Sequence, residues 1–248
     1  MESRSSVECF LDVATLTRAA ADRVVACARA AIAARGRFLF VLSGGSTPRS
    51  LYELLAADPY ATQIDWSRVH VFWSDERCVP PDSDESNYRM ARETLLDRVT
   101  LPPGNIHRIR GEDDPEAAAS SYDELLHHVI GRDSTQTFDL VLLGMGLDGH
   151  TASLFPGTAA VREMRRWVVA TRGPEPDSWR VTLTLPALNA GADVMFLVTG
   201  AEKAEPLKQV LEGSPVEPLP AQWIRPERGV LYWMFDAAAA TRLSLPRA

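Results

Sequence analysis

The sequence contains little cysteine. Cys9, Cys27 and Cys78 are the three cysteines among 248 residues, and no two of them have the CxxC spacing. An odd and sparse set argues against a disulfide framework and against a structural zinc site. We therefore expect a protein of a reducing compartment and predict a cytoplasmic location.

Long hydrophobic runs are also missing. The stretch richest in alanine and valine, residues 19–34, is interrupted by Asp22, Arg23 and Arg29, so it predicts an amphipathic helix and not a membrane span. No apolar core of a secretory signal follows the first six residues. Basic residues are fewer than acidic ones, with 26 Lys and Arg against 33 Asp and Glu, which gives a net charge of −7. We therefore expect neither a membrane nor a nucleic-acid partner.

Several catalytic signatures are absent from the sequence. It has no Gly-x-Ser-x-Gly elbow, no Walker A loop and no His-Glu-x-x-His metal motif. His127 and His128 lack a matching third ligand and are interpreted as surface residues, and His70 and His107 as packing residues. We therefore predict no bound metal.

The residues that are present indicate a globular α/β protein. Apolar residues make up 46% of the chain and charged residues 24%, which is ordinary for a folded domain. Mostly continuous apolar runs alternate with helix-like segments, as strands buried on both faces of a sheet require. We predict one domain, residues 1–248, with an open, mostly parallel sheet and helices on both faces. The predicted strands are residues 37–43, 69–74, 138–144, 180–185, 192–200 and 230–235, and the other predicted helices are 47–57, 87–99, 115–130 and 201–211.

Three clusters follow predicted strands, where ligands bind in open α/β sheets. The first is Ser43-Gly44-Gly45-Ser46-Thr47, which leads into a helix that we expect to have Thr47 as its N-cap and Pro48 as its first residue. Its glycines, hydroxyls and free helix N–H groups suit a phosphate, although a plain tight turn with a helix cap fits equally well. The second is Ser74-Asp75-Glu76-Arg77, whose charges suit sugar hydroxyls or a phosphate. Taken alone, it is better interpreted as a solvated run of charges.

The third cluster, residues 144–151, has the sequence GMGLDGHT. It formally matches the dinucleotide fingerprint, but Pro156 leaves little room for a crossover helix and no ribose-binding acid follows. We instead expect Gly146 and its neighbours to wrap a small ligand and to present Asp148 and His150. A histidine in such a loop is a natural general base.

Three further cations follow or flank predicted strands. Lys203 follows the strand of residues 192–200, and Arg172 and Arg180 flank the run of residues 180–185. Each could add positive charge for a phosphate, and each is also compatible with an ordinary surface position.

These segments, in this order, resemble the 6-phosphogluconolactonase family. The resemblance rests on LSGGSTPRSL from residue 42, VFWSDER from residue 71, FDLVLLGMGLDGHTASLFP from residue 138, RVTLTLPAL from residue 180 and VTGAEK from residue 198. It implies a fold akin to the sugar-phosphate isomerases and deaminases. It also implies hydrolysis of 6-phosphoglucono-1,5-lactone, in the oxidative pentose phosphate pathway, without a redox cofactor.

The resemblance also implies roles for individual residues. His150 is the expected catalytic residue, and the loop from Ser43 to Thr47, Arg77 and Lys203 recognise phosphate or hydroxyl groups. As our own hypothesis beside the resemblance, we expect either Asp148 or Asp75 to orient the imidazole or to bind a sugar hydroxyl. We expect a small sugar phosphate as the partner, and a monomer or a small homo-oligomer.

Two alternatives remain beside the lactonase. Glucosamine-6-phosphate deaminases look like relatives, but their corresponding segment carries a glutamate just before the proline, where this chain has Phe155. A sugar-phosphate sensor of a transcription regulator would need a helix-turn-helix segment, for which the first 40 residues leave no room.

Overall fold

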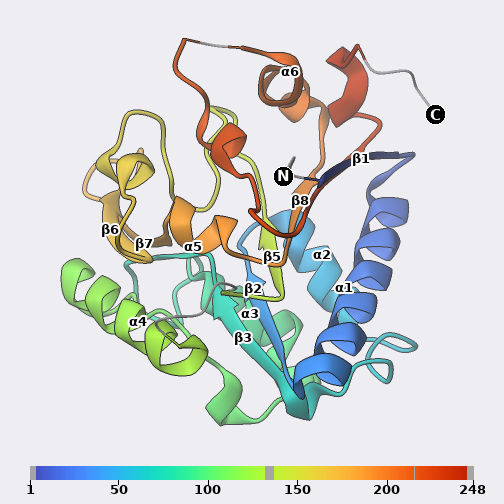
Figure 1. The fold of residues 1–248 in the computed structure, drawn as a ribbon, viewed down its shortest axis with the longest axis vertical. Coiled ribbons are helices and arrows are strands. Elements are labelled where there is room, and N and C mark those ends of the chain that lie inside the picture. Colours follow the sequence, from blue (N-terminus) through green and yellow to red (C-terminus); the bar gives the residue numbers. More distant parts are fainter. Residues whose placement is uncertain (1–3, 132–136, 215, 245–248) are drawn as a thin grey trace.

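A six-stranded parallel sheet forms the centre of the protein (Figure 1). The computed structural model describes residues 4–131, 137–214 and 216–244. The strand order is β1-β9-β8-β5-β2-β3, and every neighbouring pair is parallel. The strands are β1 Arg4–Phe10, β2 Phe38–Leu42, β3 Val69–Trp73, β5 Leu140–Leu143, β8 Asp193–Val198 and β9 Val230–Asp236.

Three helices pack together along one side of this sheet. Helix α1 (Val13–Arg35) contacts β1, β2 and β9 and also packs on α2 (Ser46–Leu55), which in turn packs on α3 (Asn87–Thr94). Asp12 caps the first turn of α1 by accepting from the backbone of Thr15, and Gly36 ends the helix with a φ of 74°. All five residues of β2 are buried, because this strand is covered on both faces.

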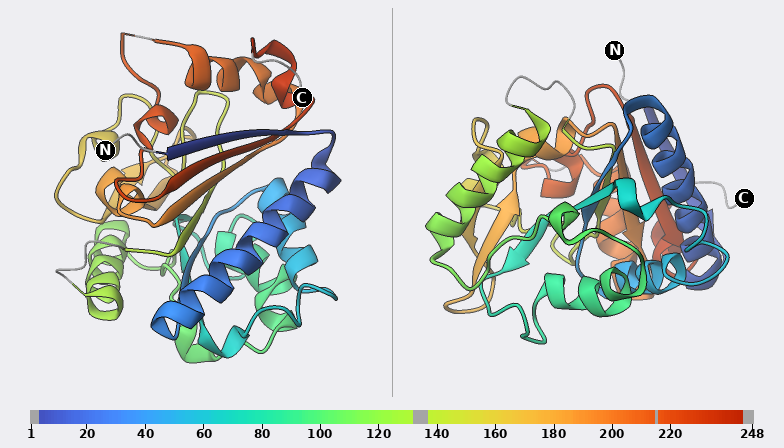
Figure 2. Two further views of the ribbon diagram at one scale, coloured as in Figure 1. Left: turned by 45° about the vertical axis from the view of Figure 1, so that its right-hand side comes forward. Right: turned by 90° about the horizontal axis from the view of Figure 1, so that it is seen from below.

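A second, antiparallel sheet lies on the other side (Figure 2). Its strands are β4 (Asp75–Arg77), β7 (Trp179–Leu183) and β6 (Val168–Arg172), in the order β4-β7-β6. Helix α4 (Pro115–Ile130) packs on β6 and β7. The remaining helices are α5 (Leu185–Asn189) and α6 (Ala204–Glu212).

The predicted fold class is confirmed, with differences in individual elements. The alternating run of residues 180–185 forms β7 of the small sheet and not a strand of the parallel sheet. The sequence analysis also missed β1, β4 and β6. The helix predicted over residues 87–99 ends at Thr94 because Leu95 leaves helical geometry, with a φ of −133°. The helix predicted from residue 201 begins as a 3₁₀ turn over Ala201–Lys203.

Within the described residues, no helix combines the length and the apolar character needed to cross a membrane. The single-domain organisation over residues 1–248 stays a prediction.

Candidate active site

A cavity of about 490 Å³ lies where the carboxyl ends of β2, β5, β8 and β9 meet the small sheet. The location agrees with the rule that open α/β sheets bind ligands at this edge. Eleven of the twelve predicted site residues line the cavity, and Asp148 lies outside its lining. The eleven are Ser43, Gly44, Gly45, Ser46, Thr47, Asp75, Arg77, Gly146, His150, Arg180 and Lys203.

The loop after β2 presents a helix N-terminus to the cavity. Gly45 is the N-cap of α2, with a φ of 110°, and no side chain within the described residues caps this helix. The first N–H groups of α2 are therefore free to donate to an anion. Gly44 must be a glycine, because a Cβ there would lie 2.0 Å from Oδ1 of Asn87.

The expectation that Thr47 caps this helix is wrong. The helix already begins at Ser46, because Gly45 adopts the backbone conformation that starts it. The Thr47 hydroxyl instead lies 2.7 Å from that of Thr199, which follows β8. This contact ties the first turn of α2 to the loop after β8 on the cavity wall.

Asp75 and Glu76 are adjacent in β4 but have different environments. Asp75 is 8% exposed, lines the cavity and accepts a 2.7 Å hydrogen bond from the Ser153 hydroxyl. Glu76 is 2% exposed and accepts from the backbone N–H groups of Arg77, Asn87 and Tyr88. Burial raises the pKa of Glu76, and these hydrogen bonds partly offset the rise. The solvated-run interpretation of this segment is therefore wrong, and Glu76 serves to fix the start of α3.

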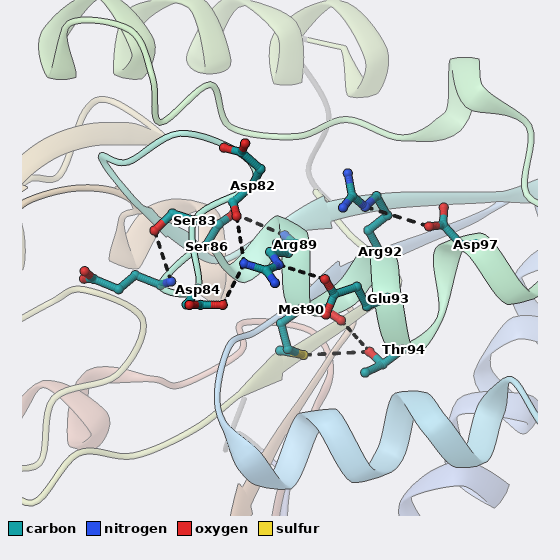
Figure 3. Close-up of polar contacts among 11 residues, drawn as sticks. Asp82, Ser83, Asp84, Ser86, Arg89, Met90, Arg92, Glu93, Thr94 and Asp97 are labelled. Atoms are coloured by element: carbon teal, nitrogen blue, oxygen red, sulfur yellow. Dashed lines mark hydrogen bonds and ion pairs between the residues drawn. The ribbon is translucent and has the colours of Figure 1, made fainter.

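Arg77 is held by the loop that precedes α3. Its guanidinium donates to the backbone carbonyl of Glu85 at 2.5 Å. Arg89 fixes this loop on α3 by donating to the carbonyl of Asp82, to Asp84 and to Glu93 at 2.7–2.8 Å (Figure 3). The carbonyl contact leaves the positive charge of Arg77 available to an anion.

His150 forms a pair with Asp148 in the loop after β5. Nδ1 of His150 lies 2.5 Å from Oδ1 of Asp148, which also accepts from the His150 backbone N–H at 3.1 Å. Burial raises the pKa of Asp148, but the hydrogen bonds and charge of His150 outweigh it and lower the pKa overall. An ionised Asp148 holds the proton of the imidazole on Nδ1, which leaves Nε2 as the acceptor.

The imidazole is also positioned by packing. A Cβ on Gly146 would lie 2.1 Å from Nδ1 of His150, so only glycine fits beside the ring. The Phe155 ring packs against the imidazole, with ring centroids 4.6 Å apart. Gly146 and Phe155 together therefore hold the orientation of the His150 ring.

Lys203 lies beside the same loop. Its ammonium group donates to the backbone carbonyl of Met145 at 2.8 Å. Burial lowers the pKa of Lys203, although nearby Glu202 and Asp148 oppose the effect. Two N–H donors of the ammonium group remain for a ligand.

The two arginines that flank the hairpin of β6 and β7 differ. Arg180 lines the cavity with a side chain that is 10% exposed, and it lies opposite Arg77 in the pairing of β4 with β7. Arg172 is 56% exposed, stacks on Trp179 and does not line the cavity. The structure thus brings Arg180, but not Arg172, into the candidate site.

The sequence analysis missed six polar residues of the cavity wall. Asp236 ends β9 and accepts from the Gly200 backbone N–H at 3.1 Å, which fixes the loop before Lys203. The sequence indicated the missed residues only weakly, through their positions near the ends of strands or at the start of a helix. The six are Asn87, Ser153, Glu175, Thr199, Glu202 and Asp236.

The other histidines lie elsewhere. His70 and His107 hydrogen-bond to one another, with Nδ1 and Nε2 3.1 Å apart. His127 is not a surface residue, because its ring packs on Trp167 and lies 3.4 Å from Asp123, whereas His128 is exposed. In the described parts of the chain, no three His, Cys, Asp or Glu side chains are placed to hold a metal ion.

Comparison with known proteins identifies the family. Residues 11–233 match the family described as glucosamine-6-phosphate isomerases/6-phosphogluconolactonase. A protein from Mycobacterium leprae named 6-phosphogluconolactonase is 42% identical over 246 residues, which are 96% of this chain and 98% of that protein. The solved structure of 6-phosphogluconolactonase from Trypanosoma cruzi is 30% identical, with a TM-score of 0.88 over 99% of both chains.

A more distant neighbour shares the fold alone. It is a monomeric glucosamine-6-phosphate deaminase, 19% identical, with a TM-score of 0.81 over 97% of this chain and 100% of the other. The resemblance seen in the sequence motifs is confirmed by these similarities. The chain belongs to the glucosamine-6-phosphate isomerase/6-phosphogluconolactonase family.

Proposed function

We propose that this protein hydrolyses 6-phospho-D-glucono-1,5-lactone to 6-phospho-D-gluconate. Relatives at about 42% identity over nearly the whole chain carry the name of that activity. The observation that carries the chemical part of the proposal is the pairing of His150 with Asp148 at a cavity that also holds Arg77, Arg180 and Lys203. A base and a group of cations in one cavity suit an anionic substrate that is attacked by water.

His150 acts as the general base. With its Nδ1 proton held by Asp148, the neutral imidazole takes a proton from water on Nε2, and the hydroxide formed attacks C1 of the lactone. The imidazolium then returns its proton to the ring oxygen as the C1–O bond breaks. Asp148 stabilises the imidazolium, and Asp75 is left to bind a sugar hydroxyl.

The substrate phosphate is held by the Ser43–Thr47 loop with Arg77, Arg180 and Lys203. The oxyanion at C1 is stabilised by backbone N–H groups of Gly44 and Gly45 or of the loop of residues 144–149. Within the latter loop, the Gly146 and Gly149 N–H groups already donate to carbonyls of their own loop. Donors preorganised at the site of developing charge are a main source of catalytic power.

The lactonase is favoured over the deaminase by Phe155. Its ring, 9% exposed, occupies the wall beside His150 where the related deaminases carry a carboxylate. Ring opening and proton transfer between C1 and C2 need several acids and bases, whereas lactone hydrolysis needs one base and a stabilised oxyanion. The proposal includes a cytoplasmic protein that acts without cofactor, nucleic acid or membrane, as a monomer or small homo-oligomer.

The test is an assay of lactone loss. The phosphorylated lactone is generated in situ, and its disappearance is followed above the spontaneous rate, with glucosamine 6-phosphate tested in parallel for ammonia release. We expect rapid lactone loss and no ammonia. Ammonia without lactone loss would assign the deaminase, and binding of sugar phosphates without either reaction would assign the sensor.

A further inference from the structure

The hairpin that joins β6 to β7 carries two ion pairs, one outside the cavity and one on the cavity wall. Arg172 and Asp177 lie 3.6 Å apart with side chains 56% and 100% exposed, and neither lines the cavity. Arg180 and Glu175 lie 3.2 Å apart, and both line the cavity. One short loop therefore provides an outer pair and a cavity pair of the same chemistry.

Arg180 is the one cavity cation that has a carboxylate partner within the described residues. Arg77 and Lys203 donate to backbone carbonyls, whereas Nη2 of Arg180 donates to Oε2 of Glu175. The Arg180 side chain is nine-tenths buried, and its buried Nε has no hydrogen-bond acceptor. A buried donor of this kind lacks the partner that most buried polar atoms have.

Glu175 is a loosely held partner. Its side chain is 63% exposed, and its Oε2 is shared between Arg180 and the Ser178 hydroxyl, each 3.2 Å away. Breaking the contact with Arg180 costs such an exposed carboxylate little free energy, because water replaces the arginine. The charge of Arg180, in contrast, is enclosed by protein and needs an anion beside it.

The loop backbone lies over the unpaired nitrogen. A Cβ on Gly173 would lie 3.1 Å from Nε of Arg180 and 3.4 Å from Oε2 of Glu175, so Gly173 and Glu175 lie close together against the guanidinium. Opening Nε to a ligand therefore requires Gly173 and Glu175 to move together. A tetrahedral anion can then accept from Nε and Nη2 together, in the side-on geometry that guanidinium groups favour.

We propose that Glu175 is a displaceable counter-ion of Arg180 and sets the specificity of the site for doubly charged phosphate groups. In the free protein Glu175 neutralises Arg180 through Nη2. A phosphate dianion replaces Glu175 and supplies the acceptor that Nε lacks. Singly charged anions and unphosphorylated sugars bring too little charge to displace the carboxylate. The inference extends the proposed function and rests on it only for the identity of the molecule that carries the phosphate.

The experiment measures the binding of inorganic phosphate by calorimetry at pH 8 and needs no catalysis. It compares the wild-type protein with Glu175→Gln and with a matched control, Asp177→Asn. Both substitutions remove one negative charge from the same loop, and asparagine tolerates the φ of 58° at position 177. Thermal unfolding checks that both variants are folded.

We expect Glu175→Gln to bind phosphate about fivefold more tightly than the wild type. This factor corresponds to the free energy of one partly exposed ion pair. Asp177→Asn should match the wild type. Acetate should compete with phosphate in Glu175→Gln and not in the wild type. Unchanged or weaker phosphate binding in Glu175→Gln, or an equal gain in Asp177→Asn, would overturn the proposal.

The lactone assay separates this inference from the proposed function. The KM for the phosphorylated lactone should fall in Glu175→Gln in parallel with the phosphate dissociation constant. Absence of lactone hydrolysis in the wild type would refute the proposed function, and the phosphate measurement would still decide whether Glu175 competes for Arg180.

Discussion

At the carboxyl edge of the parallel sheet, His150 faces a carboxylate, whereas on the outer strand β3 His70 faces another imidazole. His150 is 30% exposed in its side chain, lines the cavity and has Asp148 2.5 Å from Nδ1. The planes of His70 and His107 are 3° apart, and one N–H···N hydrogen bond joins them. The two imidazole pairs therefore differ in the charge of the group beside the ring.

The difference has a simple electrostatic cause. A negative charge beside an imidazole stabilises the imidazolium that forms during proton transfer. In the His70–His107 pair, protonation of both rings would place two N–H donors face to face. Burial, then the neighbouring His70 and Arg37, lowers the pKa of His107 to about 4. The same residue type thus lies beside a carboxylate at the cavity and is held neutral, mainly by burial, at the outer strand.

The largest expected effect comes from removing the imidazole that we propose as the general base. His150→Ala should lower kcat for the phosphorylated lactone by about 10²-fold or more, the usual scale for a general base. His107→Asn should leave kcat unchanged, because that ring lies away from the cavity. Steady-state kinetics of both variants test the contrast. Near-normal kcat in His150→Ala would remove this residue from the mechanism.

A smaller effect is expected from displacing the imidazole without removing it. In Gly146→Ala the new methyl group would lie 2.1 Å from Nδ1 of His150 and 2.7 Å from Oδ1 of Asp148, so the pair must shift. We expect kcat to fall about tenfold or more, because a displacement of about 1 Å is costly to catalysis.

Gly104→Ala is the control for this substitution. A Cβ at that position meets nothing within 4 Å. The control should keep both kcat and the melting temperature of the wild type. If Gly146→Ala also keeps its kcat, the fixed orientation of the imidazole does not matter for the reaction.

The sequence predicted the two loops of the site that are marked by a strand directly before them. The loop of Ser43–Thr47 and the loop with His150 both follow continuous apolar strands, so the strand pattern places them at one edge of the sheet. Strand β1 was missed because residues 4–10 are partly exposed along the whole strand and carry no clear hydrophobic pattern. Its place beside β9 comes from pairing with residues more than 200 positions away.

Other features depend on contacts that are distant in sequence. Asp75 to Arg77 carry three charges and do not resemble a strand, yet they pair with β7 and become partly or fully buried. That pairing brings Arg77 opposite Arg180. Similarly, nothing in the sequence around Glu175 shows that its carboxylate contacts Arg180 across a turn. The arrangement of the cations around the cavity therefore could not be predicted from the sequence and became visible only in the structure.

The smallest expected effect concerns stability and pH at the His70–His107 pair. Because the folded state lowers the pKa of His107 from 6.5 to about 4, the pair contributes its full stability above the unfolded pKa. That contribution is lost as the pH falls from 6.5 toward 4. We expect a loss of about 1 to 2 kcal/mol, less than the whole shift implies because the ring is only partly buried.

Urea unfolding between pH 7.5 and 4.5 measures this loss. His107→Asn should flatten the pH dependence by that amount, since asparagine does not titrate, whereas the exposed His128→Asn should keep the wild-type slope. Equal slopes in the wild type and His107→Asn would show that the folded protein does not hold His107 in its neutral form. The contrast with His150 would then rest on the kinetic measurements alone.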